Sequence, residues 1–497
     1  MIFQHKTTVI RSKSYFLVVL GFLLLTGCAA VGPDYVPPGT PVSKNWHTQL
    51  KGGLTAEEMN PQTLAAWWTT LNDPELSSLM ERAVAGNLDL KKARARVREA
   101  RARRGITNAD LFPTLDAKGS ATWSRSSKDT GTGKTSDLYA ASIDAGWELD
   151  IFGGVRRSVE AAEGDLEATQ ENLRDVLVSL LAEVALNYLD VRTYQIALAV
   201  AEANLQTQSE TYQLTQWRYE AGLGDELAVH QARYNLENTR SLIPAVRTRL
   251  EEAMNRIAVL LGERPGEVHD ELEKQEPIPV TPLKVAVGVP AETLRRRPDV
   301  RRAERELAAQ TARIGVATAD LYPKFTLSGS IGLEALSLRN LSSFGTWTAW
   351  GGPAISWAIF DAGAIRQNIE VQSALQEQYF IAYEAAVLSA LEEVENALVA
   401  YAEQQQRRES LTEATQAAQK AVELAQQKYE AGLTDFNNVL EAQRSLLSFQ
   451  EQLAKSEGTV TSNLVRLYKA LGGGWESMAP NEKSIAMDTG KRNEIED

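Results

Sequence analysis

Apolar residues along this chain follow a helical period in some stretches and a strand period in others. Two helical, arginine-rich stretches begin near residues 88 and 298 and end before Pro113 and Pro323, because proline cannot continue a helix interior. Beyond each proline, apolar and polar residues alternate, which is the pattern of a half-buried strand. One face of the first such segment carries Leu115, Ala117, Gly119, Ala121 and Trp123.

The opposite face of these predicted strands is polar. A return segment over residues 139–148 alternates in the same way, and residues 325–333 repeat the pattern. The segment near 347–357 is more uniformly apolar, so the sequence does not decide which of its residues lie on which face. The polar link at 124–137 predicts a long turn. Each of the two regions that follow a proline thus supplies one hairpin. Its strands are close to the ~9–11 residues of a tilted membrane-spanning strand. The polar face of the first strand carries Thr114, Asp116, Lys118, Ser120 and Thr122.

A long helical tract without proline follows each hairpin, over about 155–219 and 365–429. Some 65 residues at 1.5 Å per residue reach roughly 100 Å. The sequence AGL then turns the chain, and we expect Gly222 and Gly432 to end the helices because glycine readily adopts the left-handed conformation. A second helix returns in each copy, and Pro244 is expected to kink the first of these.

The phrase YEAGLGD at 219–225 recurs as YEAGLTD at 429–435, which is 210 residues later. Self-similarity at one fixed offset is the signature of an internal duplication. The sequence therefore contains two copies of one unit, 88–262 and 298–472, with no net insertion between matched points. Other pairs that share this offset are Asp89 with Asp299, Gly105 with Gly315, Trp147 with Trp357, Arg156 with Arg366, and Leu261 with Leu471.

Residues 1–27 carry the pattern of a secretory signal, with basic residues followed by a short apolar run over 15–25. Leu25-Thr26-Gly27-Cys28 resembles the bacterial lipobox, in which the cysteine is acylated and becomes the new N-terminus. The alternative is an ordinary signal peptide with a chance cysteine. Several acyl chains on Cys28 would anchor the protein stably. In lipoproteins of this kind an aspartate after the cysteine suggests inner-membrane retention, so Ala29 favours the outer membrane.

Composition excludes several classes of function. The net charge of −13 becomes −16 once residues 1–27 are removed, which argues against a nucleic-acid partner. Cys28 is the only cysteine, so no intrachain disulfide can form. The four histidines are scattered, and the sequence contains no phosphate loop, HExxH or CxxC pair. We therefore expect neither an enzyme nor a cofactor or metal site.

Four strands per chain cannot close a barrel, and an open sheet edge is not tolerated in hydrocarbon. Three chains would supply twelve strands around a polar lumen. Clustered tryptophans in the strand segments are typical of aromatic girdles at membrane interfaces. A soluble sandwich would show the same alternation, and the long helices alone would also suit a fibrous coiled coil or an exported adhesive rod. The predicted tryptophan girdle consists of Trp123, Trp147, Trp347, Trp350 and Trp357.

Three segments carry a family resemblance that covers nearly the whole mature chain. They are WWTTLNDPELSSLMERAVAGNLDL at 67–90, LRRRPDVRRAERELAAQTARIGVATADLYP at 294–323, and YEAGLTDFNNVLEAQR at 429–444. The chain resembles the outer-membrane efflux lipoproteins of tripartite, RND-type systems, which are TolC-like outer-membrane factors.

This resemblance implies a mainly α-helical protein with a membrane β-barrel portion. The expected assembly is a TolC-like homotrimer with a 12-stranded outer-membrane β-barrel, four strands per chain, continuous with a 12-helix periplasmic α-barrel. Segments 28–87, 263–297 and 473–497 would form an equatorial region and a C-terminal tail.

The same resemblance implies the protein's function and partners. A periplasmic adaptor and an inner-membrane RND-type transporter would work with this passive duct for drugs and small amphiphilic compounds. Duct function in metal-ion efflux or type I protein secretion remains the alternative.

The resemblance also implies a gate at the periplasmic helix tips, where acidic residues line the opening. Glu441 stands where family members commonly carry an aspartate, and Asp225, Asp435 and Arg444 are further candidates. Threefold symmetry would place each acid three times around one narrow opening, which favours cations. The alternative is that these are solvated helix-end charges. His230 is either a pH-sensitive element of the gate or a solvated histidine.

Overall fold

The computed structural model describes residues 30–39, 43–58, 60–279, 281–282 and 284–478. Cys28, the signal segment 1–27 and much of the predicted tail 473–497 therefore lie outside the described residues. The chain divides into two compact units. Unit 1 combines the described part of Met1–Gly39 with Arg96–Gln170 and Arg302–Glu384, and unit 2 combines Thr40–Ala95, Glu171–Arg301 and the described part of Ala385–Asp497.

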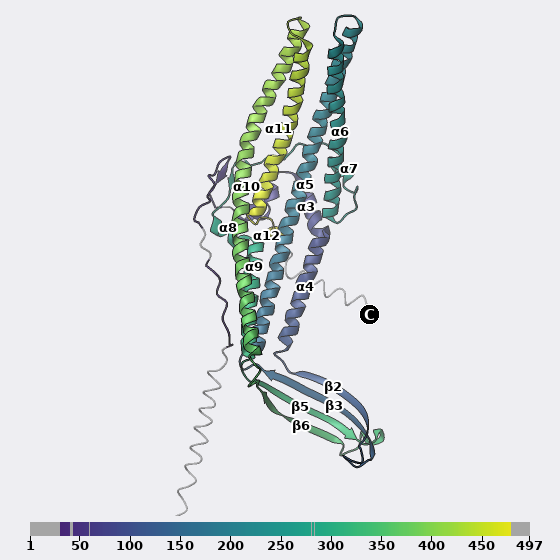
Figure 1. The fold of residues 1–497 in the computed structure, drawn as a ribbon, viewed down its shortest axis with the longest axis vertical. Helices are drawn as coiled ribbons and strands as arrows, with labels where there is room; N and C mark the ends of the chain where they lie inside the picture. Colours follow the sequence, from purple (N-terminus) through teal and green to yellow (C-terminus); the bar gives the residue numbers. More distant parts are fainter. Residues whose placement is uncertain (1–29, 40–42, 59, 280, 283, 479–497) are drawn as a thin grey trace, which may run out of the picture. The chain divides into compact units, whose positions relative to one another are not determined.

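Unit 1 contains an antiparallel four-stranded sheet in the order β2-β3-β5-β6 (Figure 1). Its pairing aligns Asp116 with Asp144, Asp144 with Ser330, and Ser330 with Trp350. Because side chains alternate along a strand, these residues share one face, the polar face predicted from the sequence. The register also fixes the facing of the last strand, placing Trp350 on the polar face and Trp347 with Leu333 on the apolar one. The strands are β2 (Thr114–Arg125), β3 (Thr135–Leu149), β5 (Lys324–Ala335) and β6 (Trp347–Ser356).

The expected long turn at 124–137 is shorter than predicted, because the two strands continue into it. Ser124 pairs with Ser136, their hydroxyl oxygens 3.0 Å apart, and Arg125 pairs with Thr135. Polar residues that pair across strands extend a hairpin as well as apolar ones do. Loop composition alone therefore made the turn too long at both ends.

The helices recur with the 210-residue offset of the sequence. Each helix of the second repeat begins 210 residues after its counterpart. The duplication is therefore present in the structure as well as in the sequence. The helix α6 continues through Pro244. The counterparts are α4 (Leu88–Ala109) and α9 (Pro298–Ala319), α5 (Gly154–Glu220) and α10 (Ala364–Glu430), and α6 (Glu226–Leu261) and α11 (Phe436–Ala470).

The same glycine turn ends both long helices. Gly222 and Gly432 adopt φ values of 72° and 71°, the left-handed region that costs glycine little. The amides of Gly222 and Leu223 donate to the carbonyls of Tyr219 and Arg218 at 2.9 and 2.8 Å. This pair of bonds is a Schellman motif, and the second repeat forms it as well. Both glycines therefore end their helices as predicted.

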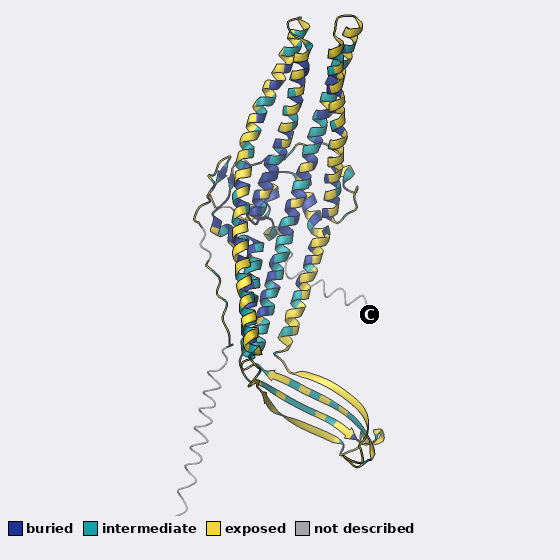
Figure 2. Cartoon of the chain, viewed as in Figure 1, coloured by how far each residue is buried: buried dark blue, intermediate teal, exposed yellow. Residues whose placement is uncertain are grey.

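The main apolar core lies in unit 2, where short elements pack on the long helices (Figure 2). Trp67 is 1% exposed; its ring stacks on Tyr468 at 5.6 Å and meets Trp68 edge-on at 5.8 Å. These short elements are α2 (Pro61–Ala65), η1 (Trp67–Leu71), α3 (Pro74–Gly86), α7 (His269–Leu272), α8 (Pro290–Arg296), α12 (Trp475–Met478) and the parallel pair β1 (Leu54–Thr55) and β4 (Val285–Ala286).

No helix among the described residues is both long and apolar enough to cross a membrane.

Replacement of the buried indole tests the role of this core. Trp67→Ala removes a large aromatic side chain, so we expect the free energy of unfolding to fall by about 3–5 kcal/mol. Chemical denaturation in detergent measures the change. Trp217→Ala is the matched control, because Trp217 is 59% exposed; equal losses for the two variants would contradict this view of the core.

Candidate functional site

The two helix-hairpin tips are joined by aromatic contacts. The guanidinium carbon of Arg218, at the end of α5, lies 4.7 Å from the ring centroid of Tyr429, at the end of α10. Tyr429 in turn packs on Phe436, the first residue of α11, with centroids 4.9 Å apart. A cation over an aromatic face is attracted by the ring quadrupole. The tips of the two repeats are therefore linked within one chain.

Arg444 is the centre of a second link between the repeats. Its Nη2 donates to Asn235 Oδ1 at 3.2 Å and to the hydroxyl of Tyr234, both on α6, and its Nη1 lies 3.4 Å from Glu441 Oε2. Tyr234 is the counterpart of Arg444, 210 residues earlier. The structure thus brings two of the sequence candidates, Glu441 and Arg444, together with two residues that the sequence analysis did not select.

The two aspartate candidates lie elsewhere, at the beginnings of the return helices. Asp225 is the N-cap of α6, and its carboxylate accepts from the Leu227 amide at 3.2 Å. Asp435 holds the same position before α11 but makes no side-chain cap bond. A carboxylate at a helix N-terminus satisfies free amides and interacts favourably with the helix dipole. Capping is therefore a sufficient structural reason for Asp225.

His230 lies beside Glu226, with its Nε2 3.7 Å from the Glu226 carboxylate. Both side chains are about two-thirds exposed to solvent. Its counterpart Leu440 is buried, so the two tips differ in polarity at this position.

Further from the tips, amide side chains join α5 to α11. Gln443 Nε2 donates to Thr211 Oγ1 at 3.1 Å, and Asn204 Nδ2 donates to Gln450 Oε1 at 2.9 Å. Gln443 and Gln208 are buried, yet the side-chain oxygen of each accepts no hydrogen bond. A buried polar atom without a partner costs free energy. The contact between the two hairpins is therefore only partly satisfied here.

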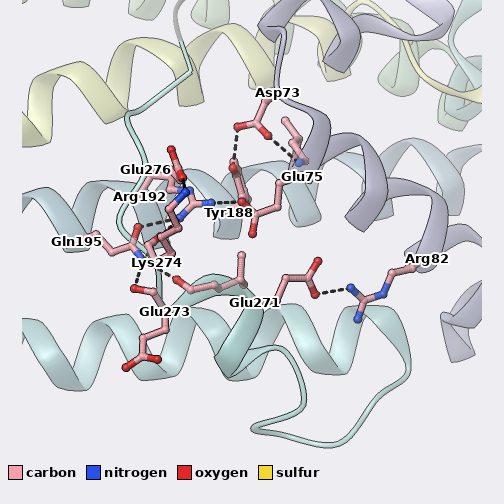
Figure 3. A network of polar contacts seen from close by, with 12 residues as sticks. Asp73, Glu75, Arg82, Tyr188, Arg192, Gln195, Glu271, Glu273, Lys274 and Glu276 are labelled. Atoms are coloured by element: carbon pink, nitrogen blue, oxygen red, sulfur yellow. Dashed lines mark hydrogen bonds and ion pairs between the residues drawn. The ribbon is translucent and has the colours of Figure 1, made fainter.

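A polar network that the sequence analysis did not predict surrounds Arg192 in unit 2 (Figure 3). The Arg192 side chain is 0% exposed; it forms an ion pair with Glu75 and donates to Gln195 Oε1 and to the Lys274 carbonyl at 2.9 and 2.8 Å. Nearby, Tyr188 donates to Asp73 at 2.6 Å. Nothing in the local sequence distinguishes Arg192 from the many surface arginines, so pattern alone could not have identified it.

Burial dominates the electrostatics of this network. It raises the pKa of the Glu75 carboxyl, and the positive charge of Arg192 offsets that effect only in part. Burial and the hydrogen bond to Asp73 also raise the pKa of Tyr188, so its phenol stays protonated and remains a donor. The network fixes α3 and the segment 273–276 to α5. Its role is structural.

Arg297 explains part of the arginine-rich segment at 294–323. Its guanidinium donates to the Ala470 carbonyl at 2.7 Å, to Asp299 at 3.0 and 2.7 Å, and pairs with Glu393 at 2.7 Å. Its counterpart Asn87 donates to the carbonyl of Leu260 at 2.9 Å, and Leu260 is the counterpart of Ala470. In both repeats, this position therefore satisfies a free carbonyl in the last turn of the return helix.

Acid titration tests the Arg297 contact. Burial alone would raise the pKa of Asp299, but hydrogen bonds and the charge of Arg297 hold it below its ordinary value of 3.8. A lowered pKa stabilises the fold above the ordinary value, and this contribution is lost as pH falls through the lowered one. We expect Asp299→Asn to lower the free energy of unfolding by about 3 kcal/mol at pH 7, and the difference to shrink below pH ~4. Chemical denaturation of both proteins at pH 7 and at a pH below ~4 measures this difference in the free energy of unfolding. A difference that does not change with pH would contradict the ion pair.

Among the described residues, no group of three or more histidine, cysteine, aspartate or glutamate side chains could hold a metal ion.

Comparison with known proteins identifies the family that the chain resembles. The family model described as outer membrane efflux protein matches residues 79–263 and again 289–473, two matches that are also 210 residues apart. Nodulation protein T of Rhizobium leguminosarum bv. trifolii is 34% identical, with 92% of this chain and 97% of that protein covered. The toluene efflux pump outer membrane protein TtgI of Pseudomonas putida is 32% identical, with coverage of 92% and 98%.

Solved structures agree with the sequence relatives. The outer-membrane channel OprN superposes with a TM-score of 0.85 at 37% identity, with 90% of this chain and all of that chain covered. The fold is that of the TolC-like outer-membrane channels. The chain belongs to the outer membrane efflux protein family.

Proposed function

We propose that this protein is the outer-membrane channel of a tripartite efflux system, a passive exit duct that an inner-membrane transporter supplies through a periplasmic adaptor. The observation that carries the proposal is the sheet of unit 1, which has one polar face, one exposed apolar face and two edges that meet no partner strand within the described part of the chain. Leu115 and Ile331 on the apolar face are 74% and 60% exposed. Lipid would cover this face, and a polar lumen would lie on the other.

The free edges require further copies of the chain. β2 and β6 end the sheet, and backbone groups at an open edge cannot remain without partners in hydrocarbon. Pairing β2 of one copy with β6 of the next repeats one heterologous contact, which closes a ring. Three copies would give twelve strands, within the range of known bacterial barrels. We therefore infer a homotrimer.

The helices of unit 1 have the same two ends as the sheet. Arg104 of α4 pairs with Glu163 of α5, α5 pairs with α9 through Glu167 and Arg305 at 3.2 Å, and Gln310 of α9 donates to Gln372 of α10 at 2.9 Å. The contact order is therefore α4-α5-α9-α10, which leaves α4 and α10 as the end helices. These are the helices that a neighbouring copy would meet.

The end helices carry complementary stripes. On α10, Glu370, Glu377 and Glu384 recur every seven residues beside an exposed seam with the 3.5-residue spacing of a coiled coil. The part of α4 in unit 1 carries five arginines and one glutamate. Opposite charges that flank an apolar seam set partner and register in helix pairs. The exposed seam on α10 consists of Val371, Ala374, Gln378 and Ile381.

Charge reversal on α10 tests this contact between copies. We expect Glu370→Lys, Glu377→Lys and Glu384→Lys together to abolish the trimer at ~0.1 M salt, because arginines of α4 would then face lysines. Native mass spectrometry in detergent measures the oligomeric state. Adding Arg96→Glu, Arg98→Glu and Arg101→Glu should restore trimers; a trimer that is insensitive to the first set would contradict the pairing.

We propose that the helix tips form the gate of the duct. Glu441 and Arg444 lie together on α11, and the Arg444 contacts with Tyr234 and Asn235 hold α11 to α6. The unsatisfied oxygen of Gln443, which bridges to Thr211 on α5, lowers the cost of separating the hairpins. In this proposal Arg444 fixes the closed arrangement, and Glu441 supplies an acidic ring at the opening. Asp225 and Asp435 lie at the outermost turns, where an adaptor would dock.

Single-channel recording tests both the duct and its gate. The purified trimer should conduct in planar bilayers, and Glu441→Ala should raise the conductance, because removing the ring loosens the acidic closure. Arg444→Ala should raise the conductance as well. Glu423→Ala is the control, since Glu423 is an exposed glutamate on α10 outside these contacts. If an assembled trimer shows no conductance in any variant, the duct itself is excluded; if only Glu441→Ala leaves the conductance unchanged, the acidic ring is excluded.

Acylation of Cys28 and anchoring in the outer membrane belong to the same proposal. The cargo is proposed to be drugs or small amphiphilic compounds, as the toluene pump relative suggests by its name. A wide duct does not select its cargo, so metal-ion efflux or protein secretion remains the competing assignment.

A further inference from the structure

The N-terminal segment at residues 30–35 is held against α5 and α9 of unit 1 by its backbone. The Val31 amide donates to the Phe152 carbonyl at 3.0 Å. The Val31 carbonyl accepts from Arg157 Nε at 3.1 Å, and the Gly32 carbonyl accepts from Arg157 Nη2 at 3.4 Å. These contacts do not depend on the side chains at positions 31 and 32.

Arg157 binds this segment from a buried position. Its side chain is only 5% exposed, and its remaining donors contact Asp34 at 2.6 Å and Glu160 at 2.8 Å. A guanidinium presents its N–H groups in a fixed planar fork, so one arginine can bind two successive carbonyls and a carboxylate. The buried charge is thus neutralised partly by the segment that it binds.

Glycines allow the segment to approach the helices closely. Gly32 has φ +91°, and a Cβ there would lie 2.4 Å from the Cα of Gly315 on α9. A Cβ on Gly315 would lie 2.8 Å from the side chain of Arg157, and one on Gly153 would lie 2.5 Å from Ala30. No other residue type fits these three positions without displacing the segment or Arg157.

Tyr35 completes the contact. Its hydroxyl donates to Glu304 at 3.2 Å, and the guanidinium of Arg305 lies 5.7 Å from its ring centroid. Burial, with the charge of Glu304, raises the pKa of the Tyr35 hydroxyl, which therefore stays protonated as a donor.

We propose that α5 and α9 form a specific binding site for the chain's own N-terminal segment at residues 30–35, which follows the proposed acylation site Cys28, with Arg157 as its recognition residue. The site fixes where the acyl chains enter the membrane. Ala30 is held at Gly153, which directly precedes α5 and follows the end of β3 at Leu149. Cys28 is two residues from Ala30, at most about 7 Å along the chain. This consequence rests on the proposed outer-membrane placement, whereas the binding site itself does not.

The duplication shows that the site belongs to one repeat only. The glycines recur in the other repeat, since Gly363 is the counterpart of Gly153 and Gly105 that of Gly315. A Cβ on either counterpart would meet nothing within 4 Å. The recognition residues do not recur, because Gln367, Arg94 and Ala95 replace Arg157, Glu304 and Arg305. One N-terminus per chain thus has one site, although the backbone shape is duplicated.

Thiol modification of the full-length, acylated protein tests the proposal. Val31→Cys supplies the probe, because Val31 is bound through its backbone, and the reagent is a polyethylene-glycol maleimide that shifts the band on a gel. Protein without Val31→Cys measures any background from Cys28. In the Val31→Cys protein, Arg157→Gln, which copies the other repeat, should raise the modification rate about fivefold or more, the factor that one lost hydrogen bond corresponds to. Gly315→Ala should do the same.

The other repeat supplies the matched controls. Gly105→Ala and Gln367→Ala should leave the rate unchanged, since neither residue contacts the segment. Equal rates in all variants would overturn the binding site. Conductance measured on the same preparations separates the two proposals, because a non-conducting protein with the expected rates would contradict the duct and leave the N-terminal site in place.

Discussion

The unpaired backbone of β2 and β6 is the constraint on which the rest of the architecture depends. Each edge presents amide and carbonyl groups that hydrocarbon cannot satisfy, and no further strand of the described residues pairs with either edge of this four-stranded sheet. Assembly with further copies is therefore a condition of membrane insertion. The helices of unit 1 have the same arrangement: α4 and α10 are the end helices of their layer, as β2 and β6 are the edge strands of the sheet.

The two repeats share the residues that set the backbone geometry. The specific side-chain contacts are made by residues that differ between the repeats. The glycine turns at Gly222 and Gly432 and the carbonyl contacts of Asn87 and Arg297 recur in both repeats. They preserve backbone geometry. Arg444 opposite its own counterpart Tyr234, and Arg157 in place of Gln367, occur once. Such positions distinguish contacts that a strictly repeated chain could not tell apart.

The sequence predicted the elements well because each has a strong local signal. The period changed from helix to strand at Pro113 and Pro323, and AGL marked the turns, so the order of the elements and the repeat agree with the structure. Its errors have local causes too: Ser124 and Ser136 read as loop residues but pair across strands. The candidate site was predicted in part. The sequence selected Glu441 and Arg444, which the structure places side by side on α11, but not Asn235, which contacts Arg444 through a tertiary contact that no local pattern encodes. Their role in a gate stays a prediction. Tyr234 could have been found, because the 210-residue offset aligns it with Arg444.

If the tips are the gate, as proposed, the duct has to be rigid elsewhere, and the distribution of polar contacts in unit 2 has this property. In unit 2 the buried Arg192 and Arg297 are surrounded by carboxylates and carbonyls, and breaking one partner of such a pair is costly. Near the tips the polar contacts between the hairpins are guanidinium groups over tyrosine rings, the hydrogen bonds of Arg444 to Tyr234 and Asn235, and the Gln443 amide with its unsatisfied oxygen. None of them is a buried pair of opposite charges. The polar contacts between the hairpins are therefore less buried where the gate is proposed than in the core of unit 2. In the proposed system a transporter and adaptor would need to supply only enough binding free energy to shift that set of contacts.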